Sequence, residues 1–110
     1  MALDPIQFIT LVRGLVDADP KQRDLHADEV TDIYKDFDSE QYRCIALMLA
    51  ELSLLETDWR ARQTQLYALS ELDEWGDVPP RAIELVRLID VGTLYGSEIE
   101  YVEWLTRDRD

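Results

Sequence analysis

The chain has very few of the residues on which catalytic and metal sites are usually built. Its 110 residues include one His, one Cys and four Gly, with no Gly-rich loop. A single Cys cannot form an internal disulfide, which agrees with a reducing compartment. His26 lacks the i, i+4 histidine partner of a zinc-binding helix, so we interpret it as a surface histidine near carboxylates. The sequence favours a protein that is not an enzyme and that uses no metal or cofactor.

Long hydrophobic runs and clusters of basic residues are also missing. The longest uninterrupted apolar run is Cys44 to Ala50, far shorter than the roughly 20 residues that cross a bilayer. Residues 1–5 contain neither a basic stretch nor the apolar core of a signal peptide, so we expect a cytoplasmic protein. The shortage of Lys and Arg argues against nucleic acid and against an anionic membrane surface as partners.

What the chain has in excess is negative charge. It contains 24 Asp and Glu residues against 11 Lys and Arg, which gives a formal charge of -13. Such a charge opposes compaction by self-repulsion, and its usual benefits are solubility and steered capture of an oppositely charged partner. Apolar residues nevertheless make up 46% of the chain, more than a disordered acidic tail contains. We therefore expect one folded domain over residues 1–110.

Apolar residues recur at helical spacing in segments that Gly and Pro punctuate. We expect helices at about 6–17 and 24–37, a third capped by Ser39, a fourth capped by Thr57 or Asp58, a fifth at about 80–90, and a sixth opened by a Ser97–Glu100 capping box. No segment alternates in the manner of a strand. The prediction is an all-α fold of about six helices in three antiparallel hairpins, packed as a HEAT-like stack or a compact helical bundle. The tail at 106–110 should fray.

The third helix is the most apolar of the six, and we expect it at the centre of the domain. Cys44 lies within it and should be a buried, unreactive thiol. Gly14 weakens the first helix, because an interior Gly costs about 1 kcal/mol relative to Ala. The predicted core residues are Ile45, Leu49, Leu52, Leu66, Leu69, Ile83 and Val86.

Two acidic clusters that contain aromatic residues form the candidate binding site. The first begins at Glu71 and surrounds Trp75 at the turn after the fourth helix, and the second lies on the last helix beside Trp104. Large aromatic side chains anchor interfaces, while carboxylates steer a basic partner. The alternative is that Trp75 folds back on the core and the acids only solvate the turn. The candidate partner-binding residues are Asp73, Glu74, Trp75, Asp77, Glu98, Glu100, Tyr101 and Glu103.

A row of aspartates on the second helix is the alternative partner-binding site. Asp28, Asp32 and Asp36 recur at i, i+4 and i+8. Like charges at that spacing destabilise a helix by about 0.2–0.5 kcal/mol per pair, and folding gives no reason for this cost. The other interpretation is a solvated helix face, helped by Arg23 and Lys35.

The C-terminal half carries two motifs around a proline-marked helix. They are WRARQTQLYALSEL at residues 59–72 and GSEIEYVEWL at residues 96–105. Together they resemble small HEAT-like proteins of bacteria, in which a pattern of Arg, Ala and Leu with a closing Leu marks the core between helices. The chain looks like the compact acidic variety found among immunity proteins that neutralise secreted polymorphic toxins. The resemblance implies an all-α repeat fold and a basic toxin domain as the partner.

We therefore expect an acidic protein-binding module. The leading hypothesis is an immunity protein that occludes a basic toxin domain, with carboxylates at the positions where the toxin holds phosphates and a Trp or Tyr in a pocket. The alternative is a scaffold or adaptor protein that uses the helical-repeat surface for a partner other than a toxin.

Overall fold

The computed structural model describes residues 2–109, and every regular element within them is helical. The predicted all-α fold class is confirmed. The α-helices are α1 (Pro5–Leu15), α2 (Pro20–Ile33), α3 (Ser39–Leu55), α4 (Trp59–Trp75), α5 (Pro80–Arg87) and α6 (Glu98–Leu105), and two short 3-10 segments are η1 (Tyr34–Asp36) and η2 (Val91–Thr93).

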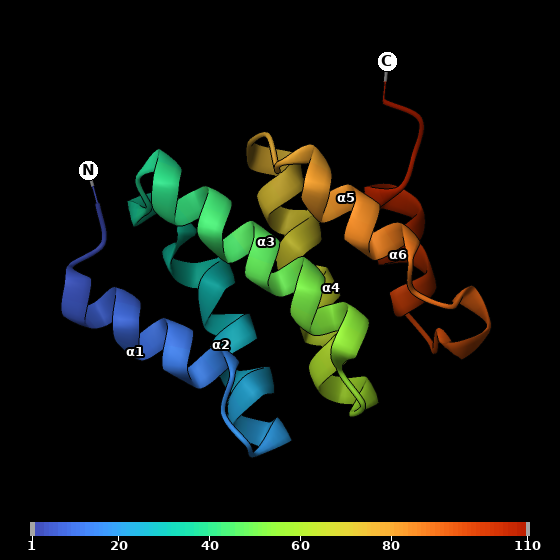
Figure 1. The fold of residues 1–110 in the computed structure, drawn as a ribbon, viewed down its shortest axis with the longest axis horizontal. Helices are drawn as coiled ribbons and strands as arrows, with labels where there is room; N and C mark the ends of the chain where they lie inside the picture. Colours follow the sequence, from blue (N-terminus) through green and yellow to red (C-terminus); the bar gives the residue numbers. More distant parts are fainter. Residues whose placement is uncertain (1, 110) are drawn as a thin grey trace.

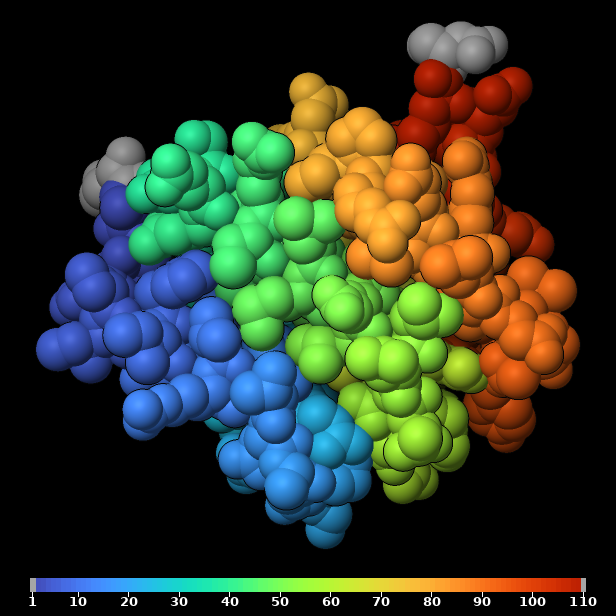
Figure 2. Space-filling view, in the orientation of Figure 1, coloured from blue at the N-terminus to red at the C-terminus, as the bar shows by residue number. Residues whose placement is uncertain are grey.

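The helices lie in two layers (Figure 1). Helices α1, α3 and α5 form the layer nearer the viewer, and α2, α4 and α6 lie behind them. Within the rear layer α2 and α6 both pack against α4, and within the front layer α3 packs against α5. Figure 2 shows α1, α3 and α5 covering the front of the molecule in turn, from blue through green to orange. The molecule is a slab of 38 × 36 × 19 Å, whose short dimension equals two layers of helix.

Aspartate side chains begin helices α1 to α4. Asp4, Asp19, Asp38 and Asp58 each accept a hydrogen bond from a backbone N–H in the first turn of the helix that follows. These N–H groups have no partner within the helix, so the caps satisfy donors that would otherwise be unpaired. The predicted Asp58 cap is confirmed.

Two predicted helix starts are wrong by a few residues. Helix α2 begins at Pro20 and not at residue 24, because the Asp19 cap and the proline at the first helical position together start the helix. Helix α3 is capped by Asp38 and not by Ser39, and Gln41 completes a capping box with that aspartate.

The predictions for the last two helices need similar corrections. Helix α5 ends at Arg87, short of the predicted residue 90. The Ser97 side chain makes no capping hydrogen bond, so the expected Ser97–Glu100 capping box is not formed. The backbone N–H of Tyr95 instead donates to the carboxylate of Glu98.

The sequence predicts α3 at the centre of the domain, but the most deeply buried helix is α4. Helix α4 packs against α2, α3 and α6 and so is covered on three sides, whereas α3 lies in the front layer with one side open to solvent. Cys44 of α3 is exposed, which corrects its predicted burial. Leu52 is half-buried. The other predicted core residues, Ile45, Leu49, Leu66, Leu69, Ile83 and Val86, are buried as expected.

Gly14 has a packing role that explains its place inside α1. A Cβ atom built on Gly14 would lie 2.1 Å from carbon atoms of the His26 ring on α2. The His26 side chain is only 20% exposed, and its Nδ1 lies 3.4 Å from Oε1 of Glu29. His26 thus lies near a carboxylate as expected but is only partly at the surface, because its ring also fills the space that the glycine leaves between α1 and α2.

We expect Gly14→Ala to destabilise the protein by about 1–3 kcal/mol, since the new methyl group overpacks the contact with His26. In a solvent-exposed helix, Gly→Ala would raise the free energy of unfolding by about 1 kcal/mol. A decrease for Gly14→Ala therefore indicates the contact with His26. Urea denaturation of Gly14→Ala and of Gly14→Ala/His26→Ala measures it. The double variant should be more stable than the sum of the single variants predicts. A more stable Gly14→Ala protein would contradict this packing.

Candidate functional site

Asp73 is held inside the protein by an ion-pair cluster with the C-terminal tail. Its side chain is 2% exposed and accepts hydrogen bonds of 2.8 Å from Arg107 and of 2.9 and 2.7 Å from Arg109. Burial alone would raise the pKa of Asp73, but the hydrogen bonds and charges of the two arginines outweigh it and hold the pKa below its usual value. Residues 106–109 are thereby fastened to α4, which corrects the predicted fraying; residue 110 lies outside the described residues.

Glu98 is held in the same way. Its side chain is completely buried and pairs with Arg62 of α4, which also donates to the backbone carbonyl of Thr93. This ion pair joins α6 to α4. Asp73 and Glu98 both belong to the predicted binding residues, but their carboxylates are used within the fold, so we remove them from the candidate surface.

A third ion pair joins α2 to the end of α3 and, through Gln65, to α4. Glu56 accepts hydrogen bonds from Arg23 at 2.8 and 2.7 Å and from Gln65 at 2.9 Å. Burial alone would raise the pKa of Glu56, but these donors and the nearby backbone lower it below its usual value. Four arginines pair with these three buried carboxylates, and none of the four is free to neutralise the exposed carboxylates: Arg23, Arg62, Arg107 and Arg109.

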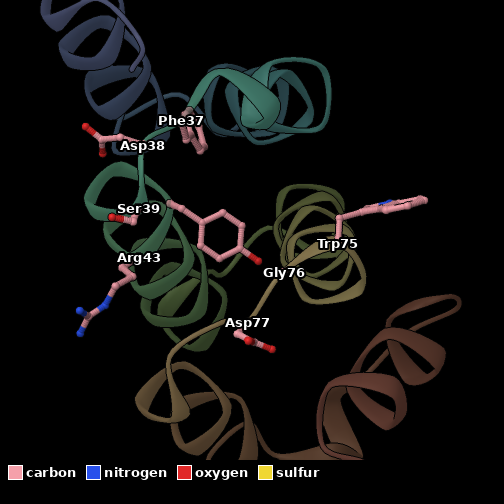
Figure 3. A pocket seen from close by; sticks show the side chains of 8 residues that line it. Phe37, Asp38, Ser39, Arg43, Trp75, Gly76 and Asp77 are labelled. Carbon is pink, nitrogen blue, oxygen red and sulfur yellow. The ribbon is translucent and has the colours of Figure 1, made fainter. Parts of the chain in front are cut away.

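Trp75 projects from the end of α4 and is 67% exposed. The alternative in which it folds back on the core is therefore wrong. The Tyr42 hydroxyl of α3 donates to the backbone carbonyl of Leu72 on α4. Figure 3 shows the Trp75 indole pointing away from α3. Burial, followed by the charges of Asp73 and Asp77, raises the pKa of Tyr42 to about 12. Trp75 and the exposed Asp77 thus border a cleft between α3 and the α4–α5 turn.

A second surface gathers acidic and aromatic side chains on the rear layer. Tyr67, Glu71 and Glu74 share the side of α4 opposite the buried Leu69, as their spacing of four and three residues requires. The Tyr67 ring lies 5.5 Å from the Tyr101 ring of α6. We call this surface the acidic aromatic face, and it comprises Asp28, Tyr34, Tyr67, Glu71, Glu74, Tyr101 and Trp104.

The negative charge of the acidic aromatic face raises the pKa of two of its tyrosines, Tyr67 and Tyr34. The charge of Glu71, followed by burial, raises the pKa of Tyr67, and Asp28 and Tyr101 act in the same direction. Burial, followed by the charges of Glu71 and Glu74, raises the pKa of Tyr34. Carboxylates from α2 and α4 therefore act on rings from η1 and α4, which places them all on one surface.

Glu71 and Glu74 have no compensating charge within residues 2–109. Neither forms an ion pair there, and the last turn of α4 contains no basic residue. Negative charge near a helix C-terminus is unfavourable by about 0.3–1 kcal/mol because the helix dipole has its negative end there. The two carboxylates thus weaken the helix that carries them.

The acidic aromatic face contains a groove between α4 and α6. Ser70, Glu74, Tyr101 and Trp104 line it. The structure therefore joins the two predicted clusters through Glu74 and Tyr101. Next to the groove, the guanidinium of Arg107 lies 3.7 Å from the centre of the Trp104 ring.

The remaining predicted residues lie apart from the groove. Glu100 and Glu103 are exposed on α6. The predicted row of Asp28, Asp32 and Asp36 does not continue along one helix, because α2 ends at Ile33 and Asp36 belongs to η1. The charge of Asp28 contributes to the raised pKa of Tyr67.

Sequence reasoning missed Tyr34 and Tyr67. A signal for Tyr67 was present, because helical spacing places it with Glu71 on the side of α4 opposite Leu69. Tyr34 lies in the 3-10 segment after α2. There the 3.6-residue period of an α-helix no longer predicts which residues share a face.

Within residues 2–109, no group of three or more His, Cys, Asp and Glu side chains could hold a metal ion. In the same part of the chain, no helix combines the length and the apolar character that crossing a membrane requires. Comparisons with protein-family models, with curated proteins and with solved structures return no match.

Proposed function

We propose that the protein is a non-catalytic binding module that captures a basic protein surface with its acidic aromatic face. The observation that carries the proposal is the pair Glu71 and Glu74, which form no ion pair within residues 2–109, lie near the unfavourable end of α4 and are surrounded by three tyrosines and a tryptophan. These two carboxylates weaken the fold and form no ion pair within residues 2–109. A binding partner that supplies a cation explains why they are present. Aromatic rings beside it provide large contact area at low entropy cost.

The role we propose for this module is that of a cytoplasmic immunity protein. Its carboxylates would occupy the positions where a toxin domain holds phosphates, and the rings would exclude water around them. Support comes from the all-α fold, from the net charge of -13 and from the resemblance of the C-terminal half to acidic HEAT-like immunity proteins.

An adaptor protein with a non-toxin partner is the second candidate, since the same face would serve it equally well. A neighbouring reading frame that encodes a large secreted protein with a basic C-terminal domain favours the immunity role. The absence of such a frame favours the adaptor.

We expect association with that basic domain to be electrostatically steered, because a charge of -13 creates a long-range field around the free protein. Stopped-flow mixing at increasing salt measures this. The association rate constant should fall by about tenfold or more between low and physiological ionic strength, while the dissociation rate constant changes much less. An association rate constant that does not depend on salt would leave the charge with a role in solubility alone.

A further inference from the structure

The groove between α4 and α6 offers hydrogen-bond acceptors and ring faces, and no cationic side chain lines it. Its lining consists of Ser70, Glu74, Tyr101 and Trp104. The Ser70 hydroxyl donates to the carbonyl of Tyr67 at 2.7 Å, so its oxygen remains able to accept. The Glu74 carboxylate is exposed and forms no ion pair within residues 2–109. A ligand that donates hydrogen bonds and carries positive charge matches this lining.

The chain itself shows which cation suits this combination of ring and carboxylate. The guanidinium of Arg107 lies 3.7 Å from the centre of the Trp104 ring, and the same group donates to the carboxylate of Asp73 at 2.8 Å. A planar guanidinium can stack on a ring with its face and donate to a carboxylate with its edge. An ammonium group is a compact, strongly hydrated charge and lacks this geometry.

We propose that the groove of Ser70, Glu74, Tyr101 and Trp104 is a binding site for one arginine side chain of the partner. The guanidinium lies against the rings of Tyr101 and Trp104 and donates to Glu74, with the Ser70 hydroxyl as a further acceptor. The site deepens the proposed function and depends on it, because it names the residue type through which a basic partner is held.

Two peptides, hexa-arginine and hexa-lysine, test the site at low ionic strength. The chain has three tryptophans, so the indole N–H signals in ¹⁵N NMR spectra report on separate places: Trp104 at the groove, Trp75 at the α4–α5 turn, and Trp59 beside Tyr95, 5.0 Å away between ring centres. We expect hexa-arginine to shift the Trp104 signal in a saturable way and to bind more tightly than hexa-lysine.

Two glutamine variants separate the groove from the general charge. Glu74→Gln should weaken hexa-arginine binding about threefold, the effect of losing one solvent-accessible ion pair. Glu103→Gln is the matched control, because it removes the same charge from an exposed residue of α6 outside the groove. It should weaken binding less than Glu74→Gln does, because Glu103 does not line the groove and contributes only to the general negative field.

Three other outcomes overturn the proposal in distinguishable ways. Equal binding of hexa-lysine at Trp104 removes the preference for arginine. A shift confined to Trp59 or Trp75, or equal effects of Glu74→Gln and Glu103→Gln, removes the groove but leaves a protein that binds basic partners. If neither peptide binds even at low ionic strength, the proposed function fails together with the site.

Discussion

Replacing Leu69 with alanine is expected to destabilise the protein by about 2–5 kcal/mol, the usual effect of removing a large buried side chain and leaving a cavity. Leu69 is completely buried in α4, the helix that contacts both layers, so the surrounding helices cannot close the space without moving several neighbours. Small domains are stable by about 5–15 kcal/mol, so this one change removes a large part of the total.

Chemical denaturation measures the effect, and Leu55→Ala is the matched control. Leu55 is 68% exposed at the end of α3, so the same loss of atoms should change the free energy of unfolding by no more than about 0.5 kcal/mol. Similar effects of the two substitutions would show that α4 is not the centre of the core.

Removing the Glu98 carboxylate is the second change with a large expected effect. Glu98→Ala leaves the guanidinium of Arg62, which is 13% exposed, and the backbone N–H of Tyr95 without their acceptor. Breaking a buried ion pair from one side typically costs about 3–5 kcal/mol, because the remaining charge stays buried and unpaired. The free energy of unfolding should fall accordingly, although one negative charge has been removed from a very acidic protein.

Glu100→Ala, two residues further along α6, provides the control. Glu100 is exposed and forms no ion pair within residues 2–109, so its loss should matter by no more than about 0.5 kcal/mol. If both variants unfold at the same denaturant concentration, Glu98 does not join α6 to α4, and it returns to the candidate binding surface where the sequence first placed it.

Local sequence signals predicted the helices well. Asp58 caps α4 through a residue three positions later, and Pro80 restricts the backbone at its own position in α5. Both signals are local, so they can be recognised from the sequence without knowing the tertiary structure. The same local view misplaced Cys44. Its place in the most apolar helix suggested burial, but exposure depends on which helices pack around α3.

The candidate site was predicted only in part, because its residues are sorted by contacts far apart in the chain. Asp73 and Glu74 are adjacent and chemically alike, yet Asp73 is buried by arginines 34 and 36 residues away, while Glu74 remains exposed. Glu98 likewise depends on Arg62, 36 residues before it. Nothing in the local pattern of charges separates a carboxylate that holds the fold together from one that faces a partner.

In the proposed function, Glu71 and Glu74 weaken the fold and serve to bind a basic partner. The variant Glu71→Gln/Glu74→Gln should raise the free energy of unfolding by a few tenths to about 1 kcal/mol, because it removes uncompensated charge near the C-terminal end of α4. The same variant should bind hexa-arginine about tenfold more weakly, which corresponds to about 1.4 kcal/mol of binding free energy.

One matched pair of variants, measured for both stability and affinity, is the most direct test. Glu40→Gln/Glu51→Gln removes the same charge from exposed residues of α3, in the other layer of the slab. We predict that only Glu71→Gln/Glu74→Gln combines higher stability with weaker binding. Equal loss of affinity in the two double variants, or lower stability of Glu71→Gln/Glu74→Gln, would contradict a binding role for the acidic aromatic face.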